Sequence, residues 1–149
     1  MTQQDLYYYM HKFIDGVIST CGKNGQPESA VVGLGQTDKL EIIFGTNHST
    51  RKYKNIIENP HVSFVLWEEN TTMQYEGVAT ELFGEEKQRL IEIFHTKVPS
   101  AAHFKNQQGQ VYFKITPTWI RFTDYKNKTS PVQEFLFSSG QLIPFTSAP

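Results

Sequence analysis

The sequence predicts an antiparallel β-barrel with helices added at separate points along the chain. Most of its β-type runs follow one another through short polar turns, which is typical of hairpins. The helical segments stand apart and do not alternate with every strand, as they would in a doubly wound parallel sheet. With 149 residues, 38% of them hydrophobic, the chain is long enough for one packed domain and short for two.

The N-terminal part reads as a helix followed by a meander of three strands. Apolar residues at helical spacing in DLYYYMHKFI predict a helix near residues 5 to 15. A β-type run at 17–21 leads into the turn GKNGQP, whose Asn-Gly pair favours a hairpin. The return strand is SAVVGLG, and a third strand covers residues 40 to 46.

The middle of the chain predicts a helix and a second hairpin. The helix runs near residues 50 to 59, where Asn59 cannot remain helical before Pro60. The strands HVSFVLW and MQYEGVATEL follow, joined by a polar turn. Gly77 within the second strand indicates a bulge or the close approach of another group.

The C-terminal part predicts a helix near residues 84 to 95, an irregular polar connection, and two strands. The strands are VYFKIT and WIRFTDY, which lie on either side of Pro117 at an expected turn or sheet edge. The tail, residues 126–149, mixes polar residues with the runs EFLF and LIPF. We treat residues 1–149 as a single domain whose tail could pack on a second copy of the chain.

Composition excludes several classes of function. Fourteen Lys and Arg against fifteen Asp and Glu give a net charge of −1, which argues against a nucleic-acid or anionic-membrane surface. Cys21 is the single cysteine, so neither an intrachain disulfide nor a Cys-rich zinc site is possible. Without a signal-peptide pattern or a run of about 18 apolar residues, a cytoplasmic location is expected.

One segment places cations at a helix start, where acidic residues are favoured. FGTNHSTRKYKNIIENP passes from a strand into a helix that Ser49 or Thr50 can cap. Arg51, Lys52 and Lys54 then fall at the start of the helix, where unpaired N–H groups already carry partial positive charge. Such conflicts tend to mark functional sites.

A bound phosphate would resolve this conflict. It would accept hydrogen bonds from the helix N–H groups, from Arg51 and Lys52, and from the hydroxyls of Thr46, Ser49 and Thr50. The alternative is a solvated basic face. The sequence has neither a P-loop nor a GxGxxG motif, so the phosphate would not belong to a P-loop or Rossmann nucleotide.

In the order KNGQP, FGTN, STRK, NIIENPHVSFVLW and MQYEGVATEL, the sequence resembles the pyridoxamine 5′-phosphate oxidase-like superfamily of FMN-binding split barrels. The resemblance covers residues 13–95, fits WIRFTDY more loosely and barely extends into the tail. It implies a six-stranded antiparallel split β-barrel and a homodimer that holds FMN at its interface.

The resemblance also implies a set of cofactor-binding residues. Thr46, Thr50, Arg51 and Lys52 match the FMN-phosphate positions, and Ser49 is an adjacent candidate. Two strand residues, Thr72 and Gln74, compete for polar contacts with the flavin ring, and Gln74 could equally be an ordinary exposed residue. Trp119 and Arg121 could reach the flavin of the partner, or could be a core tryptophan and a surface arginine.

Two departures separate the chain from the oxidases proper. Its second strand, ESAVVGLG, lacks their basic pair, and its C-terminus lacks their basic and aromatic substrate-binding residues. The leading hypothesis is therefore an FMN-dependent oxidoreductase for an unassigned small-molecule substrate, a reductase rather than an oxidase. The alternatives are a non-enzymatic FMN-binding protein for storage or stress, and a haem- or deazaflavin-binding relative. The sequence identifies no catalytic residue, and its histidines have no metal-ligand spacing.

Overall fold

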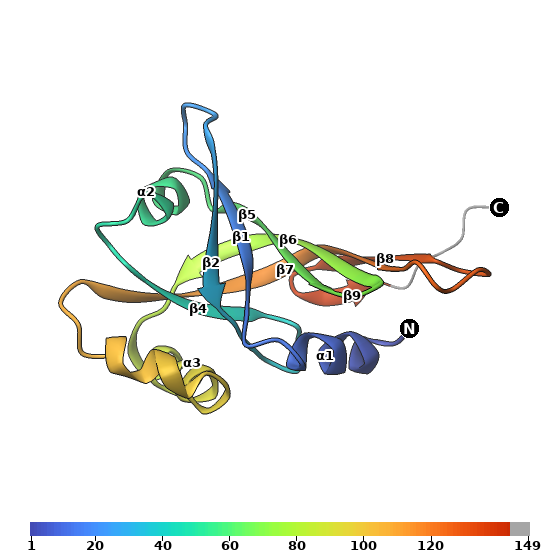
Figure 1. The fold of residues 1–149 in the computed structure, drawn as a ribbon. Helices are drawn as coiled ribbons and strands as arrows, with labels where there is room; N and C mark the ends of the chain where they lie inside the picture. Colours follow the sequence, from blue (N-terminus) through green and yellow to red (C-terminus); the bar gives the residue numbers. More distant parts are fainter. Residues whose placement is uncertain (144–149) are drawn as a thin grey trace.

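The computed structural model describes residues 1–143, which form one curled antiparallel sheet with helices around it (Figure 1). The helices are α1 (Gln3–His11), α2 (Arg51–Glu58), α3 (Gly84–Lys97) and the short 3-10 helix η1 (Pro99–Phe104). The strands are β1 (Asp15–Cys21), β2 (Pro27–Gly33), β3 (Gly35–Gln36), β4 (Ile42–Asn47), β5 (His61–Glu68), β6 (Thr71–Glu81), β7 (Gln110–Asp124), β8 (Val132–Ser138) and β9 (Gln141–Ile143).

The strand order is β2-β1-β5-β6-β7-β4-β3, with β8 and β9 added beside β7. Although β2 and β3 lie at opposite ends of this order, only Leu34 separates them in the chain. The sheet must therefore curl until its two edges meet. This confirms the predicted antiparallel split barrel, with nine strands in the described sheet where the family resemblance implied six.

The two strands expected around Pro117 are one continuous strand, so that prediction was wrong. β7 pairs with β6 along its length, with β4 as far as Ile115 and with β8 from Trp119 onward. Pro117 therefore falls between the β4 and β8 ladders, at the point where the β6 register shifts between Glu76 and Gly77. A missing N–H is tolerated at such a place.

Gly77 lies at this register shift, as the sequence predicted. A Cβ on Gly77 would lie 2.5 Å from the Thr116 carbonyl oxygen, so no larger residue fits without movement of the backbone.

The remaining differences concern element boundaries. α1 begins and ends earlier than predicted because Thr2 and Asp5 form a capping box and β1 has already begun at Asp15. β4 begins at Ile42, not at residue 40, because Leu40 is buried in a turn at φ 62°.

Part of the tail is regular structure. β8 pairs with β7, and a turn with positive φ at Ser139 and Gly140 returns the chain as β9. The tail up to residue 143 thus extends its own sheet, while the end of the LIPF run lies outside the described residues.

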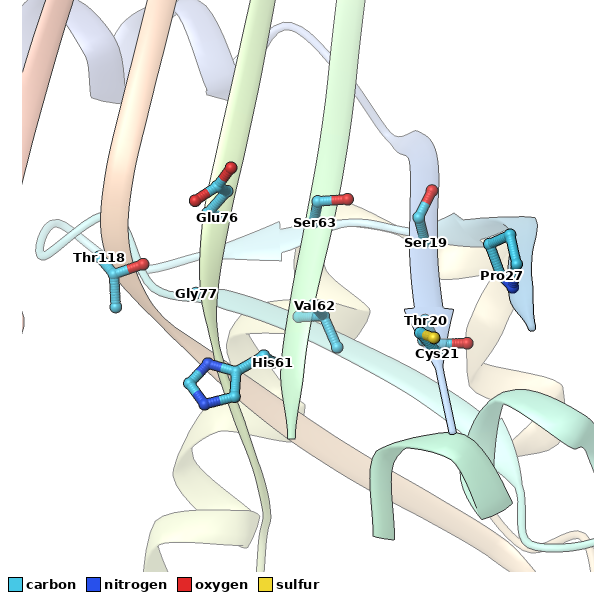
Figure 2. Close-up of a pocket in the computed structure, with 10 residues that line it drawn as sticks. All are labelled: Ser19, Thr20, Cys21, Pro27, His61, Val62, Ser63, Glu76, Gly77 and Thr118. Carbon is cyan, nitrogen blue, oxygen red and sulfur yellow. The ribbon is translucent and has the colours of Figure 1, made fainter. Parts of the chain in front are cut away.

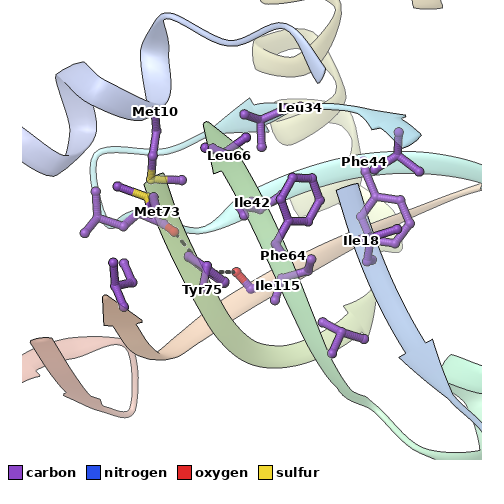
Figure 3. Packing of buried hydrophobic residues seen from close by; sticks show 14 of the residues in the cluster. Met10, Ile18, Leu34, Ile42, Phe44, Phe64, Leu66, Met73, Tyr75 and Ile115 are labelled. Carbon is purple, nitrogen blue, oxygen red and sulfur yellow. Dashed lines mark hydrogen bonds between the residues drawn. The ribbon is translucent and has the colours of Figure 1, made fainter. Parts of the chain in front are cut away.

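The barrel interior is filled by large apolar side chains from the strands and from α1, among them Met10, Ile18, Phe44 and Phe64 (Figure 3). Tyr75 is the main polar exception. Its buried hydroxyl lies 3.0 Å from both the Leu40 and Ile115 carbonyl oxygens, and burial raises its pKa well above the usual value. A second cluster packs α3 against the other face of β4 and β7, through Ile43, Leu90, Phe94 and Tyr112. This packing fixes β4, whose end carries the start of α2.

Candidate functional site

The start of α2 is held by hydroxyl groups. Thr50 is its N-cap, as one of the two sequence candidates, and its Oγ1 accepts a hydrogen bond from the Tyr53 N–H at 3.3 Å. The same oxygen lies 3.1 Å from Thr46 Oγ1 near the end of β4 and donates to the Asn47 carbonyl at 2.8 Å. The cap thus joins the end of the strand to the first turn of the helix.

Lys52 completes this group. Its Nζ donates to Thr46 Oγ1 at 3.5 Å, so an ammonium and two hydroxyls lie together beside the free N–H groups of the helix. We refer to Thr46, Thr50 and Lys52 as the α2-start cluster. Hydroxyls, an ammonium and helix N–H groups are all donors to an anion. The predicted phosphate-binding residues thus come together in part.

Arg51 and Ser49 lie outside this cluster. The Arg51 guanidinium extends toward β2, with Nε 3.6 Å from Glu28 Oε2, and its side chain is 80% exposed. Ser49 is exposed, and its hydroxyl donates to Asn47 Oδ1 at 2.8 Å.

Glu28 is a residue that the sequence reasoning missed. Its carboxylate is only 14% exposed and also accepts a hydrogen bond from Asn55 Nδ2 at 3.3 Å. Arg51, Glu28 and Asn55 line a polar cleft of about 380 Å³ between α2 and the β1–β2 hairpin. An acidic residue on β2, 23 positions before the arginine, gave no local signal of this contact.

The other predicted residues form a second group on the outward face of the sheet. Gln74 pairs with Arg121 across β6 and β7, and Trp119 lies opposite Glu76. Thr72 is two residues before Gln74 on the same face. Gln74 is exposed, whereas the other three are partly buried, and Arg121 Nε lies 3.7 Å from Glu134 Oε1. Trp119 is thus not a core residue.

The two groups lie far apart within one copy of the chain. Thr46 pairs with Val111 and Gln74 with Arg121, so ten residues of β7 separate them, roughly 33 Å of strand. That span is longer than a mononucleotide. A mononucleotide lying along β7 would therefore not extend from one group to the other within one copy of the chain.

The outward face also carries exposed apolar side chains in a row across the strands. Val31 and Val65 flank Val17 in the register, and Trp67, with 57% of its surface exposed, lies two residues beyond Val65. The alternation in HVSFVLW placed Phe64 and Leu66 inward and left Val65 and Trp67 outward. These residues form an apolar surface without a cover in a single copy.

A shallow cleft of about 330 Å³ lies on the same face, between β1, β5, β6 and β7 (Figure 2). It brings together Cys21, His61 and Glu76 with the hydroxyls of Ser19, Ser63 and Thr118. No local pattern in the sequence indicated this grouping, because its members come from four strands. Within residues 1–143 no group of three or more His, Cys, Asp or Glu side chains could hold a metal ion.

Comparison with known proteins identifies the family. The model of the pyridoxamine 5′-phosphate oxidase family matches residues 11–124, which include both groups of candidate residues. The chain belongs to this family. A curated member, the pyridoxine/pyridoxamine 5′-phosphate oxidase of Ehrlichia ruminantium, is 37% identical over 75 residues, or 49% of the chain and 39% of that relative. The chain thus matches well under half the length of this curated relative.

Solved structures share the fold at low sequence identity. A haem-binding protein from Mycobacterium smegmatis matches 91% of the chain and 58% of its own, with a TM-score of 0.77 and 12% identity. General Stress Protein 26 from Bacillus anthracis matches 80% of the chain and 92% of its own, with a TM-score of 0.66 and 21% identity. Among the helices that the structure describes, none is both long and apolar enough to cross a membrane.

Proposed function

We propose that this member of the pyridoxamine 5′-phosphate oxidase family is a cytoplasmic FMN-binding protein that acts as a flavin-dependent oxidoreductase on a small molecule. The α2-start cluster is the observation that carries this proposal. It supplies an ammonium, two hydroxyls and helix N–H groups within one hydrogen-bonded group, and no carboxylate contacts it in the described residues. A phosphate monoester fits that set of donors.

The chain's own residues would hold the cofactor at two ends. Lys52, Thr46 and Thr50 would bind the phosphate, while Thr72 and Gln74 present polar groups to the ring from another copy. The flavin supplies hydride chemistry when bound, and the protein supplies orientation and electrostatics. Arg51 is available only if it exchanges Glu28 for the phosphate.

The separation of the two groups along the sheet supports a homodimer as part of this proposal. Its interface would be the outward face of the sheet, where Val31, Val65 and Trp67 are exposed. A two-fold interface of this kind would cover apolar surface and bring the sheet-face residues of one copy to the α2-start cluster of the other.

The test compares two ligands, FMN and riboflavin, on the purified protein. Titration of apoprotein with FMN and with riboflavin, followed by flavin fluorescence, isolates the contribution of the phosphate. We expect FMN to bind at least 100-fold more tightly, from about 3 kcal/mol or more of charge-assisted contacts. Equal affinities for FMN and riboflavin, or a haem spectrum in the purified protein with no flavin binding, would overturn the proposal. Oxidation of reduced nicotinamide by the holoprotein with an artificial acceptor then separates an enzyme from a storage protein.

A further inference from the structure

A third cleft lies between the two helices α1 and α3, and its lining includes none of the candidate flavin residues. Its volume is about 660 Å³. We call it the α1–α3 groove and define it by Tyr7, His11, Ile14, Arg89, Ile93 and Lys97, with Gln36 of β3 among its lining residues. Figure 1 shows α1 and α3 at the same end of the barrel.

A chain of hydrogen bonds joins the two helices at this groove. Lys97 donates to the Met10 carbonyl oxygen of α1 at 3.1 Å and to the side-chain oxygen of Gln36. Because that oxygen is occupied, the Gln36 amide nitrogen is the donor to His11 Nδ1, at 2.8 Å. His11 thus accepts this hydrogen bond at Nδ1. Gln36 itself is 3% exposed.

Within the part of the chain that the structure describes, the charge of Lys97 lacks a counter-ion. Both of its acceptors are neutral, and the ion pairs found within residues 1–143 include neither Lys97 nor Arg89. Burial lowers the pKa of the Lys97 ammonium to about 8. The other titratable groups that face the groove are Tyr7, His11 and Glu92, of which Glu92 is the sole carboxylate and is exposed. An unpaired, partly buried cation is costly unless an anion joins it.

Part of the wall around these cations is apolar. Ile14 is 56% exposed and Ile93 36% exposed, although both are large aliphatic side chains. Tyr7 stacks on His11, with ring centroids 5.8 Å apart and an interplanar angle of 24°. The groove therefore combines apolar surface with two cations that have no carboxylate partner.

We propose that the α1–α3 groove binds a small organic anion, a carboxylate with an aromatic or aliphatic body. The carboxylate would lie against Lys97 and Arg89, and the body would cover Ile14 and Ile93. The competing explanation is that Lys97 only ties α1 to α3. That explanation accounts for the hydrogen bond to Met10, but not for the exposed isoleucines or for Arg89.

The test uses naphthalene-2-carboxylate as the probe on the FMN-saturated protein, so that the flavin site is already filled. Binding is measured by calorimetry and by ligand-observed NMR, with the uncharged naphthalene-2-carboxamide as the matched ligand. Arg89→Gln changes an exposed side chain without an ion pair and should fold normally. Lys87→Gln, on the same helix but over the Tyr112 ring at 5.9 Å, is the control.

We expect the carboxylate to bind more tightly than the carboxamide, and Arg89→Gln to weaken the carboxylate about three- to tenfold, with Lys87→Gln unchanged. Affinity in the wild type should fall as pH rises above 8, where Lys97 loses its proton, and should no longer do so in Lys97→Met. Equal binding of both probes, no binding at millimolar concentration, or an unaffected Arg89→Gln would overturn the proposal. A Lys97→Met variant that fails to fold leaves the Arg89→Gln result decisive.

Discussion

Replacing Lys52 by Ala is the most direct test of the α2-start cluster. Among the described residues, Lys52 is the one cation whose charged atom contacts the hydroxyls of the cluster, at 3.5 Å from Thr46 Oγ1, whereas Arg51 extends toward Glu28. A charge-assisted hydrogen bond to a phosphate contributes about 1.5–3 kcal/mol. Lys52→Ala should therefore weaken FMN binding about 10- to 150-fold and leave riboflavin binding nearly unchanged.

Two further variants make the test specific. Arg51→Ala should cost less, because an exposed guanidinium must first leave Glu28 to reach a phosphate. Lys54→Ala removes an equal charge from the same helix, where Lys54 lines the polar cleft, and should change FMN affinity less than threefold.

Flavin fluorescence titration of apoprotein, with thermal melts in parallel, provides the measurement. Apo Lys52→Ala should melt at or slightly above the wild-type temperature, because a cation at a helix N-terminus is unfavourable without an anion. If Lys52→Ala and Lys54→Ala weakened FMN binding equally, the effect would be diffuse electrostatics and the cluster would not be a phosphate site.

Four more changes follow from the structure. Glu28→Gln should tighten FMN binding about two- to fivefold in the same titration, because Arg51, which is itself exposed, loses an ion-pair partner worth up to about 1 kcal/mol; weaker binding would contradict this. Gly77→Ala should lower the free energy of unfolding in urea by at least about 1 kcal/mol, since its Cβ would lie 2.5 Å from a carbonyl oxygen. The lowered pKa of Lys97 means that the unfolded chain binds more protons than the folded chain between pH 7 and 9.5, so this group should raise the free energy of unfolding of the wild type over that range. Lys97→Met should lose that part of the rise. Val65→Lys should shift sedimentation from dimer to monomer, and an unchanged sedimentation coefficient would place the interface elsewhere.

The sequence predicted those parts of the fold that depend on local patterns. The cap at Thr50, the end of α2 at Asn59 and the bulge at Gly77 each depend on a residue and its immediate neighbours. Pro117 was misjudged because its tolerance depends on where β4 stops and β8 starts, two ladders formed by distant segments. Proline within a β-type run suggests that the strand ends there. Its missing N–H matters, however, only if a partner strand lies on the side to which that N–H would point.

The candidate site shows the same division. The rule-breaking run Arg51-Lys52 was visible in the sequence because a helix start and its charges are adjacent in the chain. The sequence could not show that the side chains of Arg51 and Lys52 point in different directions, since Arg51 on α2 extends toward Glu28, which lies on β2, far from it in the chain.

The pairing of Arg51 with Glu28 bears on how tightly the proposed cofactor is held. The oxidases that this chain resembles usually carry a basic pair on the second strand, whereas here β2 contributes a carboxylate that is only 14% exposed. A phosphate at the α2-start cluster must therefore compete with Glu28 for Arg51, and it gains no cation from β2. Glu28 also accepts a hydrogen bond from Asn55 Nδ2 at the same carboxylate oxygen, which helps to hold that oxygen near Arg51. We expect FMN to bind this chain through Lys52 and the hydroxyls first, with weaker affinity than a site with two additional cations would give, and with an affinity that falls as salt screens the charge of Lys52. Measured FMN affinity that did not change between 50 mM and 500 mM salt would refute this reasoning.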